Sequence, residues 1–392
     1  MIYSYTATRV VGRLNIDIHL TPDKQLYCFI GESGVGKTVM LETMAKSLFY
    51  IHTVFRSQRA DKNYSGLIFK EKINYQIKDY LLHLPDSIEI NQKSIKSAED
   101  GWGVISLNDI RNYGVPIECD RPVVFIGAKE RGYLGNLQSK QFQMLGDRFE
   151  RWLQVFEKSY NSMYGESTDH GQIAQWFIQR IAINPAFIPE ANIHMEETIA
   201  VLEIMQRLEP NLKLVQTDSQ GNKQLSLLFH EGNLLFDGVP IEKLPTGFIS
   251  IIRIIQEIVS AYGAWHKDNS PLNETAGIVF IDEIEAHLHI KWQYRILSLL
   301  KEQFPFTTFY VTTHSPLVLS NLERDEGYKL IRENNDITAN PIDDMQGYFL
   351  ADIVQTYFEV DPVTAPLSKQ SLDRQRYARK ALLALQGTLE II

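Results

Sequence analysis

A glycine-rich octapeptide, GESGVGKT at positions 31–38, carries the residue types that hold a phosphate. Glycines let backbone amides approach phosphate oxygens without an intervening Cβ. A lysine at the seventh position can reach the β- and γ-phosphates, and the hydroxyl of the following threonine can bind Mg²⁺. An apolar run at 26–30 precedes the loop and a helical pattern follows it, so the helix N-terminus adds amides and a positive dipole end.

The spacing therefore predicts a Mg²⁺-dependent nucleoside triphosphate site. The alternative is a glycine-rich turn that binds no phosphate. Lys37 and Thr38 both stand where the phosphate-binding motif requires them, which makes this alternative much weaker. The predicted phosphate loop consists of Gly31, Glu32, Ser33, Gly34, Val35, Gly36, Lys37 and Thr38.

Two adjacent acids follow an apolar tetrapeptide much further along the chain. IVFI at 278–281 predicts a buried strand that ends in Asp282 and Glu283. Beside the phosphate loop, Asp282 would bind Mg²⁺ and Glu283 would take a proton from the attacking water. Paired acids are common on solvated loops but seldom follow four buried aliphatic residues, so the pattern favours a catalytic pair.

A third strand pattern, FTTFYVTTHSP, ends in His314. A neutral imidazole at the same sheet edge can donate a hydrogen bond to the γ-phosphate and so respond to its presence. Alone, this histidine would be read as a side chain satisfied in a turn. The two preceding motifs favour the catalytic interpretation.

Composition limits the class of protein. The chain has 392 residues, 44% of them hydrophobic and 22% charged, which is typical of a globular protein. No apolar run is long enough to predict a membrane span, and the N-terminus lacks a signal-peptide pattern. Two cysteines cannot form a disulfide framework. With a net charge of −9, contact with nucleic acid would need a local basic patch. We expect a soluble cytoplasmic protein.

Alternating strand patterns and helical patterns predict an α/β fold. The segments divide into 1–56, with the phosphate loop; 57–211, an insertion that is mainly helical but includes a core strand at 121–128; 212–344, with the acidic pair; and 345–392, a helical tail. The sequence within 57–120 is mixed and polar, and LPDSIEINQKS is predicted to form turns or loops. Apolar patterns predict helices within 137–207, 248–262 and 292–304.

Together, GESGVGKT, VFIDEIEAHLH and VTTHSP resemble the ABC-type ATPases, in the branch that includes RecF-like and OLD-like proteins. The resemblance implies a mixed central sheet flanked by helices, an antiparallel β subdomain, and two ATP molecules sandwiched in a homodimer or higher homo-oligomer. It places the signature loop at LPTG, with Gly247 as the signature glycine. Pro245 replaces the usual serine there; Thr246 can substitute for it and cap the following helix.

Other family elements transfer less specifically. Residues 286–289 occupy the place of the D-loop, which contacts the partner subunit. His287 and His289 lack further metal ligands at a recognisable spacing, so a zinc site is disfavoured. For the Q-loop, Gln138 and Gln141 both remain open, and nearby Lys129 and Arg131 could instead contact phosphate or DNA.

The remaining segments resemble ATPase subunits of prokaryotic antiphage defence, as in the PARIS and Septu systems. The strand pairs before LPTG and the segment GYFLADIVQTYFEVDP carry this resemblance. No heptad coiled coil lies between 50 and 243, which argues against SMC and Rad50-like proteins. The short tail after TTHSP lacks a nuclease-like acidic cluster, and its basic run at 374–380 is more typical of a solvated helix face.

Two functions follow from the resemblance. The chain is either the ATPase and scaffold that controls a toxic partner, for which the resemblance implies a nuclease, or a RecF-like repair ATPase that clamps duplex DNA. Nuclease activity in the chain itself is disfavoured because Glu130, Asp147 and Glu150 show no paired pattern on strand ends that would hold two metals.

Overall fold

The computed structural model describes residues 1–10, 14–53, 85, 87–96, 119–129, 131, 145–164, 172–182, 191–230, 233–265, 272–345 and 348–358. The chain divides into a large unit, 1–346, and a C-terminal unit, 347–392. In the second unit the described helix is α11, Leu350–Phe358. The Q-loop candidates Gln138 and Gln141, the acid Glu130 and the basic run 374–380 lie outside the described residues. The predicted domain boundaries stay predictions.

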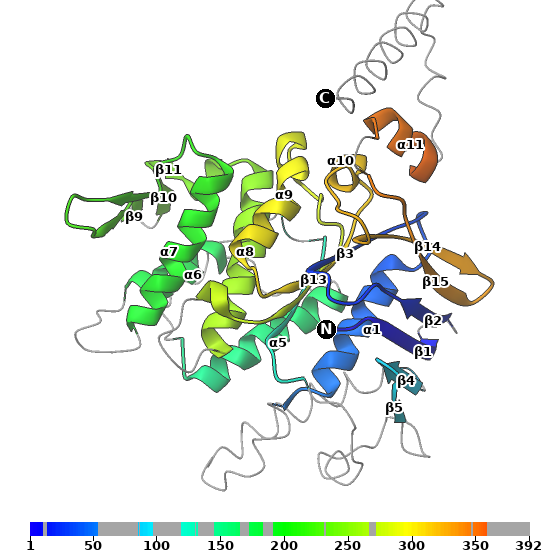
Figure 1. Ribbon diagram of the computed structural model, residues 1–392. Coiled ribbons are helices and arrows are strands. Elements are labelled where there is room, and N and C mark those ends of the chain that lie inside the picture. The colour runs from blue at the N-terminus through cyan, green and yellow to red at the C-terminus, as the bar shows by residue number, and fades with distance from the viewer. Residues whose placement is uncertain are drawn as a thin grey trace, which may run out of the picture. The chain divides into compact units, whose positions relative to one another are not determined.

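The large unit contains strands and helices in mixed order (Figure 1). Its strands are β1 (Ser4–Val10), β2 (Leu14–His19), β3 (Leu26–Ile30), β4 (Ser87–Ile90), β5 (Lys93–Lys96), β6 (Val123–Ile126), β7 (Val215–Thr217), β8 (Lys223–Leu225), β9 (Leu227–His230), β10 (Asn233–Phe236), β11 (Val239–Pro240), β12 (Ile278–Ile281), β13 (Thr308–Thr312), β14 (Gly327–Glu333) and β15 (Asp336–Pro341). Among the residues that the structure describes, its α-helices are α1 (Lys37–Tyr50), α5 (Arg148–Tyr164), α6 (Gln172–Ile181), α7 (Ala191–Leu208), α8 (Thr246–Trp265), α9 (Ile290–Gln303) and α10 (Pro316–Leu319).

The main sheet joins a parallel half to a largely antiparallel half. Among the described residues its strand order is β5-β4-β1-β2-β15-β14-β3-β13-β12-β6. From β14 to β6 every neighbouring pair is parallel, and β5, β4, β1 and β2 pair antiparallel. The predicted antiparallel β subdomain is thus continuous with the central sheet. The fold is the predicted α/β P-loop architecture.

The prediction of loops over LPDSIEINQKS was wrong. Residues 87–96 form the hairpin β4–β5, which pairs with β1 and extends the sheet. Its two turn residues, Asn91 and Gln92, have φ of 51° and 65°, as a tight hairpin turn requires. The Asn91 side chain accepts from the amides of Tyr3 and Ser4, which ties the turn to the start of β1. The turn lacks glycine, so its sequence signal is weak.

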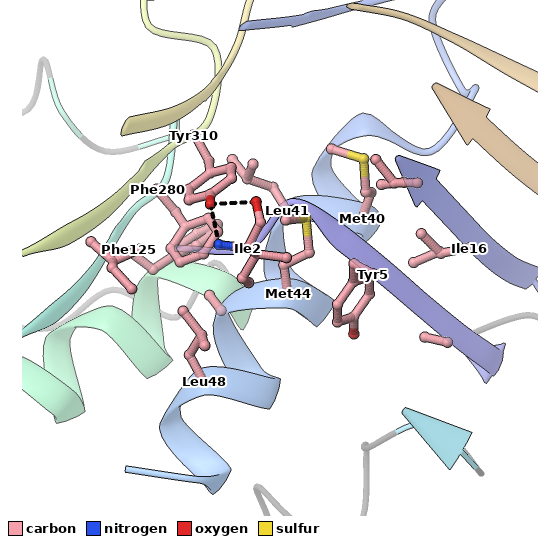
Figure 2. Packing of buried hydrophobic residues seen from close by; sticks show 14 of the residues in the cluster. Ile2, Tyr5, Ile16, Met40, Leu41, Met44, Leu48, Phe125, Phe280 and Tyr310 are labelled. Atoms are coloured by element: carbon pink, nitrogen blue, oxygen red, sulfur yellow. Dashed lines mark hydrogen bonds between the residues drawn. The ribbon is translucent and has the colours of Figure 1, made fainter. Parts of the chain in front are cut away.

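The core lies between the sheet and α1. Alternate residues of β3, Tyr27 and Phe29, face the same apolar cluster as Met40 and Met44 of α1. Figure 2 shows Met40 and Met44 in this cluster together with Tyr310, whose hydroxyl accepts from the amide of Ile2 and donates to its carbonyl, both at 2.7 Å. These bonds satisfy a buried phenol. They also fix the chain start onto the strand that leads to His314.

The helices α5 to α8 form a second packed region beside β6. A buried carboxylate, Glu197 of α7, accepts from Arg151 of α5 and Arg180 of α6. Burial alone would raise the pKa of Glu197, but the two guanidinium groups hold it below its usual value. The predicted mainly helical insertion is therefore helical over α5–α7, whereas β4, β5 and β6 belong to the main sheet.

The helix α8 is long and apolar enough by composition to cross a membrane, but 83% of its most apolar window is buried inside the fold. Such burial is typical of the core helix of a globular protein. Within the large unit α8 packs against α5 and α7, which explains its apolar surface.

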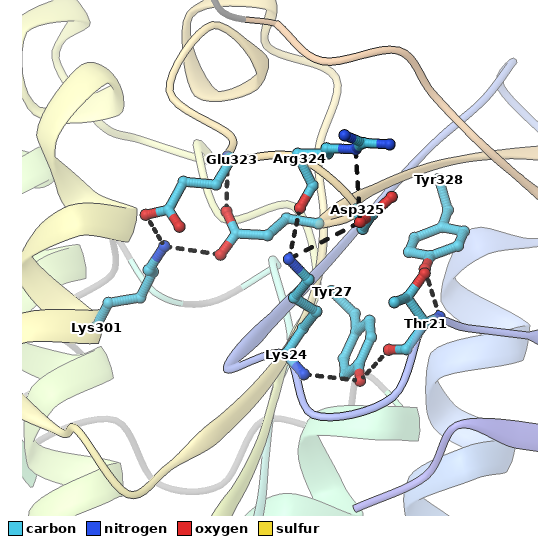
Figure 3. Close-up of polar contacts among 9 residues, drawn as sticks. Thr21, Lys24, Tyr27, Lys301, Glu323, Arg324, Asp325 and Tyr328 are labelled. Atoms are coloured by element: carbon cyan, nitrogen blue, oxygen red, sulfur yellow. Dashed lines mark hydrogen bonds and ion pairs between the residues drawn. The ribbon is translucent and has the colours of Figure 1, made fainter.

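A polar cluster, drawn in Figure 3, lies at the amino ends of the parallel strands, whereas the phosphate loop follows the carboxyl end of β3. Lys301, at the end of α9, donates to Glu323 and to buried Glu326, each at 2.7 Å. Lys24, just before β3, donates to the carbonyl of Arg324 at 2.8 Å. These contacts hold the segment before β14 to α9 and to the start of β3, so they fix the strands whose other ends carry the site.

Candidate functional site

The predicted site residues converge at one edge of the sheet because three neighbouring strands are parallel. The phosphate loop follows β3, Asp282 and Glu283 follow β12, and His314 lies two residues after β13. The registers pair Ile281 with Val311, and Thr312 with Phe29, so the three strands end together. Their carboxyl ends form the location at which α/β sheets bind ligands.

The phosphate loop has the backbone that its glycines predict. Gly34 and Gly36 have φ of 83° and 109°, a region that residues with a side chain avoid. Gly36 is the N-cap of α1. A Cβ at Gly36 would lie 2.5 Å from Cδ1 of Ile337, so a larger residue would have to displace that side chain of β15 as well as adopt the strained φ. The loop therefore leads into α1 with the helix N-terminus at the site.

Lys37 is folded back over the loop. Its Nζ donates to the carbonyls of Gly31 at 2.8 Å and Glu32 at 2.9 Å. Burial lowers the pKa of Lys37, and the charges of Asp282 and Glu283 oppose that effect. The ammonium is thus held between the loop and the acids, where a phosphate would replace its carbonyl partners.

Thr38 and Asp282 are in direct contact. The Thr38 hydroxyl donates to Oδ2 of Asp282 at 2.8 Å, and the Thr312 hydroxyl donates to Oδ1 at 2.6 Å. Asp282 is buried, so both carboxylate oxygens need such partners. A hydroxyl and a carboxylate side by side match the all-oxygen donor set that Mg²⁺ prefers, so these residues fit the predicted ion.

Glu283 has an unusual backbone. Its φ of 45° lies in the left-handed region, which is costly for a residue other than glycine. The Thr312 hydroxyl accepts from its amide at 2.8 Å. Arg131 donates to the carbonyl of Glu283 and, at 2.8 Å, to that of Asp282. The surrounding contacts thus hold the carboxylate-bearing residue in a conformation that it would not adopt alone.

Arg131 was predicted as a possible phosphate or DNA contact, but the structure places it behind the acidic pair. The side chain is buried, and its Nε and Nη1 have no hydrogen-bond partner among the described residues. Burial lowers the pKa of Arg131 to about 10, against the charges of Glu285, Asp282 and Glu283. Its contacts are with backbone carbonyls of the acidic loop.

Glu285 is a site residue that the sequence reasoning missed. Its Oε1 accepts from the amide of His314 at 2.5 Å, and its Oε2 accepts from the hydroxyl of Thr313 at 2.6 Å. The signal available in the sequence is a third acid, two positions after Glu283, but its hydrogen-bond partner lies 29 residues further on. His314 itself is half-buried at the strand edge, where it was predicted.

The signature segment starts α8 differently from the prediction. Thr246 does not cap the helix: it is the first helical residue, and the carbonyl of Pro245 accepts from Phe248 at 2.9 Å and Ile249 at 3.2 Å. A proline is suited to this place because an N-cap residue needs its carbonyl, not its amide. A Cβ on Gly247 would lie 2.7 Å from the carbonyl of His287. The glycine therefore lets the signature segment touch the predicted D-loop.

Three of the possible metal ligands considered in the sequence make local hydrogen bonds in the structure. His289 caps α9, with its Nδ1 accepting from the amide of Lys291 at 3.3 Å, and no cluster of three metal-ligating side chains occurs in the part of the chain that the structure describes. Asp147 and Glu150 accept reciprocally from each other's amides at 2.9 Å, which makes them a capping box for α5. These acids have a structural role.

Comparison with known families agrees with these motifs. Residues 138–320 match a family model described as an AAA domain, putative AbiEii toxin, Type IV TA system. The match includes the signature, the acidic pair and His314, while the phosphate loop precedes it.

Individual relatives match over short segments. The chain is 40% identical over 82 residues to the Septu protein PtuA of Bacillus mycoides, covering 21% of this chain and 11% of that protein. It is 38% identical over 96 residues to the Retron Vc95 probable ATPase of Vibrio cholerae, covering 24% and 18%. A Septu PtuA of Bacillus thuringiensis is 27% identical over 133 residues, covering 32% and 34%. The chain thus spans about a third or less of the length of these relatives. Their identity over the matched segments confirms the predicted resemblance to defence-system ATPases.

Solved structures align with this chain over most of its length but at low scores. The SMC head domain from Thermotoga maritima aligns at 13% identity and a TM-score of 0.37, over 87% of this chain and 99% of that one. A dimeric ATP-binding cassette bound to ADP and Pi aligns at 13% identity and a TM-score of 0.32, over 88% and 100%. These scores are low, so the fold assignment rests on the strand order and phosphate loop described above.

Proposed function

We propose that this chain binds and hydrolyses ATP with Mg²⁺ as an ABC-type ATPase, and that ATP-driven assembly lets it control a toxic partner in antiphage defence. The observation that carries the proposal is the contact of Thr38 with Asp282 beside Lys37, at an edge where Glu283 and His314 also converge. Each residue type at this edge matches a requirement of phosphoanhydride hydrolysis.

Binding is the role of the phosphate loop and of α1. The loop amides and the helix N-terminus receive the phosphate oxygens, while Lys37 exchanges its carbonyl partners for the β- and γ-phosphates. Thr38 and Asp282 would hold the Mg²⁺ that neutralises phosphate charge. Their direct hydrogen bond already places the two oxygens side by side.

Hydrolysis is the role of Glu283 and His314. Glu283 would accept the proton of the attacking water, and its fixed backbone keeps the carboxylate from relaxing away from the site. His314 would donate to the γ-phosphate from the neighbouring strand end.

Assembly is proposed through the surface formed by the signature and the predicted D-loop. Among the described residues no partner is found for the backbone amides of Thr246 and Gly247 at the start of α8. These two amides would face the γ-phosphate held by a second copy of the chain, and the exposed side chain of Thr246 lies at the same helix end. The similarity to Septu and retron proteins supports a role as a sensor or scaffold for a separate effector, with nuclease chemistry as the expected class.

The test uses Glu283→Gln, which keeps the side chain's size and removes the base. The variant should bind ATP, hydrolyse it at least about a hundredfold more slowly, and accumulate as an ATP-bound dimer or larger oligomer in light scattering. If the wild type and Glu283→Gln each assembled equally with and without ATP, the ATP-sandwiched dimer would be excluded. The purified chain should leave plasmid DNA and tRNA intact in Mg²⁺ or Mn²⁺.

Co-expression with the protein encoded next to it tests the defence role. A stable complex whose toxicity needs Lys37 would support it. If instead duplex DNA stimulates hydrolysis and its binding weakens steeply with salt, the RecF-like clamp would be the better assignment.

A further inference from the structure

We propose that Glu285 is a positioning residue that couples His314 to the predicted partner-facing segment 286–289. The inference rests on the proposed function, because it assigns a role within that same hydrolytic site. Glu285 would act through His314 and would not contact the nucleotide itself.

The first link runs from Glu285 to the histidine loop. Both carboxylate oxygens are used: Oε1 accepts from the amide of His314 at 2.5 Å and Oε2 from the hydroxyl of Thr313 at 2.6 Å. Two acceptors on one rigid carboxylate fix two successive residues, and bonds to an ionised acceptor are the strong class. The position of the imidazole is therefore determined by a side chain of the acidic loop.

The second link returns from the histidine loop to the same segment. The hydroxyl of Ser315 donates to Oε1 of Gln293 at 2.8 Å, and Nε2 of Gln293 donates to the carbonyl of Leu288 at 2.9 Å. The amide of Leu288 in turn donates to the carbonyl of Glu285 at 2.9 Å. The hydrogen bonds close a ring that holds the histidine loop and residues 285–288 as one body.

This ring lies between the two places at which ATP would bind. His314 belongs to the proposed nucleotide site of its own chain. The carbonyl of His287 instead packs against Gly247, in the proposed contact with the partner: a Cβ on Gly247 would lie 2.7 Å from it. A displacement of His314 by the γ-phosphate would therefore move Glu285 and segment 286–289 with it. Ser250 of α8 donates to the carbonyl of Ala286 at 3.2 Å and extends the connection to the signature helix.

The fold does not depend on Glu285 alone. The histidine loop is also anchored where the amide of Thr313 donates to the carbonyl of Phe29 at 3.1 Å, and the amide of Ile284 donates to the carbonyl of Thr312 at 3.0 Å. Loss of the carboxylate should thus leave β12 and β13 paired while it frees His314. A positioning role predicts slower hydrolysis without weaker nucleotide binding.

The test is a double-mutant cycle in the full-length protein with Glu285→Ala, His314→Ala and the combined variant. Glu285→Ala should lower the ATPase kcat at least about tenfold, while ATP affinity by calorimetry stays within about twofold. In the His314→Ala background it should have little further effect, because residues that act through one another are not additive. Glu274→Ala, an exposed acid outside the site, is the matched control.

Hydrogen exchange gives a readout that does not require activity. In the nucleotide-free protein, Glu285→Ala should speed exchange of the His314 amide about tenfold or more, because it loses its acceptor, and Gln293→Leu should increase exchange across 286–289. If Glu285→Ala lowers stability, Glu285→Gln replaces it, since the amide oxygen can serve only one of the two donors. Equal losses of kcat in both backgrounds, or unchanged exchange at His314, would overturn the inference. If Lys37→Ala did not affect nucleotide binding, the proposed ATPase function would be wrong. The hydrogen-exchange result would then still decide whether Glu285 positions His314.

Discussion

The hydroxyl of Thr38 lies 2.8 Å from a carboxylate oxygen of Asp282, although 244 residues separate the two in the chain. The contact exists because β3 and β12 both pair in parallel with β13, so the loops after them open at the same edge. We propose this pair as the place for a divalent cation, and the other predicted site residues lie around it.

Asp282→Asn should separate nucleotide binding from the use of Mg²⁺. The amide keeps the size of the side chain and one acceptor for Thr38 or Thr312, but it removes the charge that a hard cation requires. We expect ATP binding in EDTA to change little, the Mg²⁺-dependent gain in affinity to disappear, and hydrolysis to fall at least about a hundredfold. Calorimetry with and without Mg²⁺ checks this, and an undiminished response to Mg²⁺ would contradict the site.

Lys37→Ala should weaken ATP binding by at least about tenfold, because a charge-assisted contact to phosphate contributes about 1.5–3 kcal/mol. The variant leaves the carbonyls of Gly31 and Glu32 to other donors, so the fold should be retained. Lys213→Ala is the control, since that lysine is exposed and outside the site. Equal affinities for wild type, Lys37→Ala and Lys213→Ala in a calorimetric titration would show that the loop does not bind nucleotide.

Substitutions at Gly247 should prevent the ATP-bound assembly formed by Glu283→Gln. Gly247→Asp places a carboxylate at the proposed phosphate contact, but any Cβ there would also meet the carbonyl of His287 at 2.7 Å. Gly247→Ala separates the two causes, because it adds the steric conflict without the charge. We expect Gly247→Asp to abolish the oligomer in light scattering and Gly247→Ala to weaken it. Full assembly of both double variants would argue against this surface as the interface.

Glu42, on α1 one turn after Thr38, should make stability depend on pH. Burial raises its pKa from 4.5 to about 7, against the opposing effect of Lys46, whose Nζ lies 3.7 Å away. The folded state binds the proton of Glu42 more tightly than the unfolded chain does. The resulting contribution to the free energy of unfolding is therefore full below about pH 4.5 and is lost as the pH rises through 7. Glu42→Gln should remove that loss, so the variant should gain about 1–3 kcal/mol over wild type between pH 5 and 8. Urea unfolding in EDTA measures it, and a pH-independent difference would disagree.

Arg131→Met should leave the protein about as stable as wild type, or stabilise it, while slowing hydrolysis. Two of its buried nitrogens have no partner among the described residues, so their removal is favourable and offsets the cost of leaving two backbone carbonyls without a donor. The same change removes the donor to the carbonyls of Asp282 and Glu283, so the left-handed backbone at Glu283 loses support. Thermal unfolding and single-turnover hydrolysis report the two effects; a loss of stability without loss of rate would show that Arg131 only packs.

Local sequence determined the parts of the site that lie directly at strand ends. The loop 31–38, Asp282 and Glu283 could be predicted because an apolar run fixes a strand, and the residues after it must emerge at the sheet edge. The strands β3 and β12 have the bounds of their apolar runs, 26–30 and 278–281. His314 was placed in the same way. Its catalytic role and those of the other site residues stay predictions until they are tested.

Tertiary structure decided the contacts whose partners are distant in the chain. Glu285 and Arg131 carry no local pattern, because their hydrogen bonds reach residues 29 and 151 positions away. The hairpin 87–96 was missed since its turn lacks glycine and its partner strand begins at Ser4. Thr246 could not be distinguished from a cap by residue type, because the choice between a side-chain oxygen and the carbonyl of Pro245 depends on the backbone angles of the preceding turn. Periodicity fixes which face of an element is buried, whereas the identity of the group packed against it is set only when the chain folds back on itself.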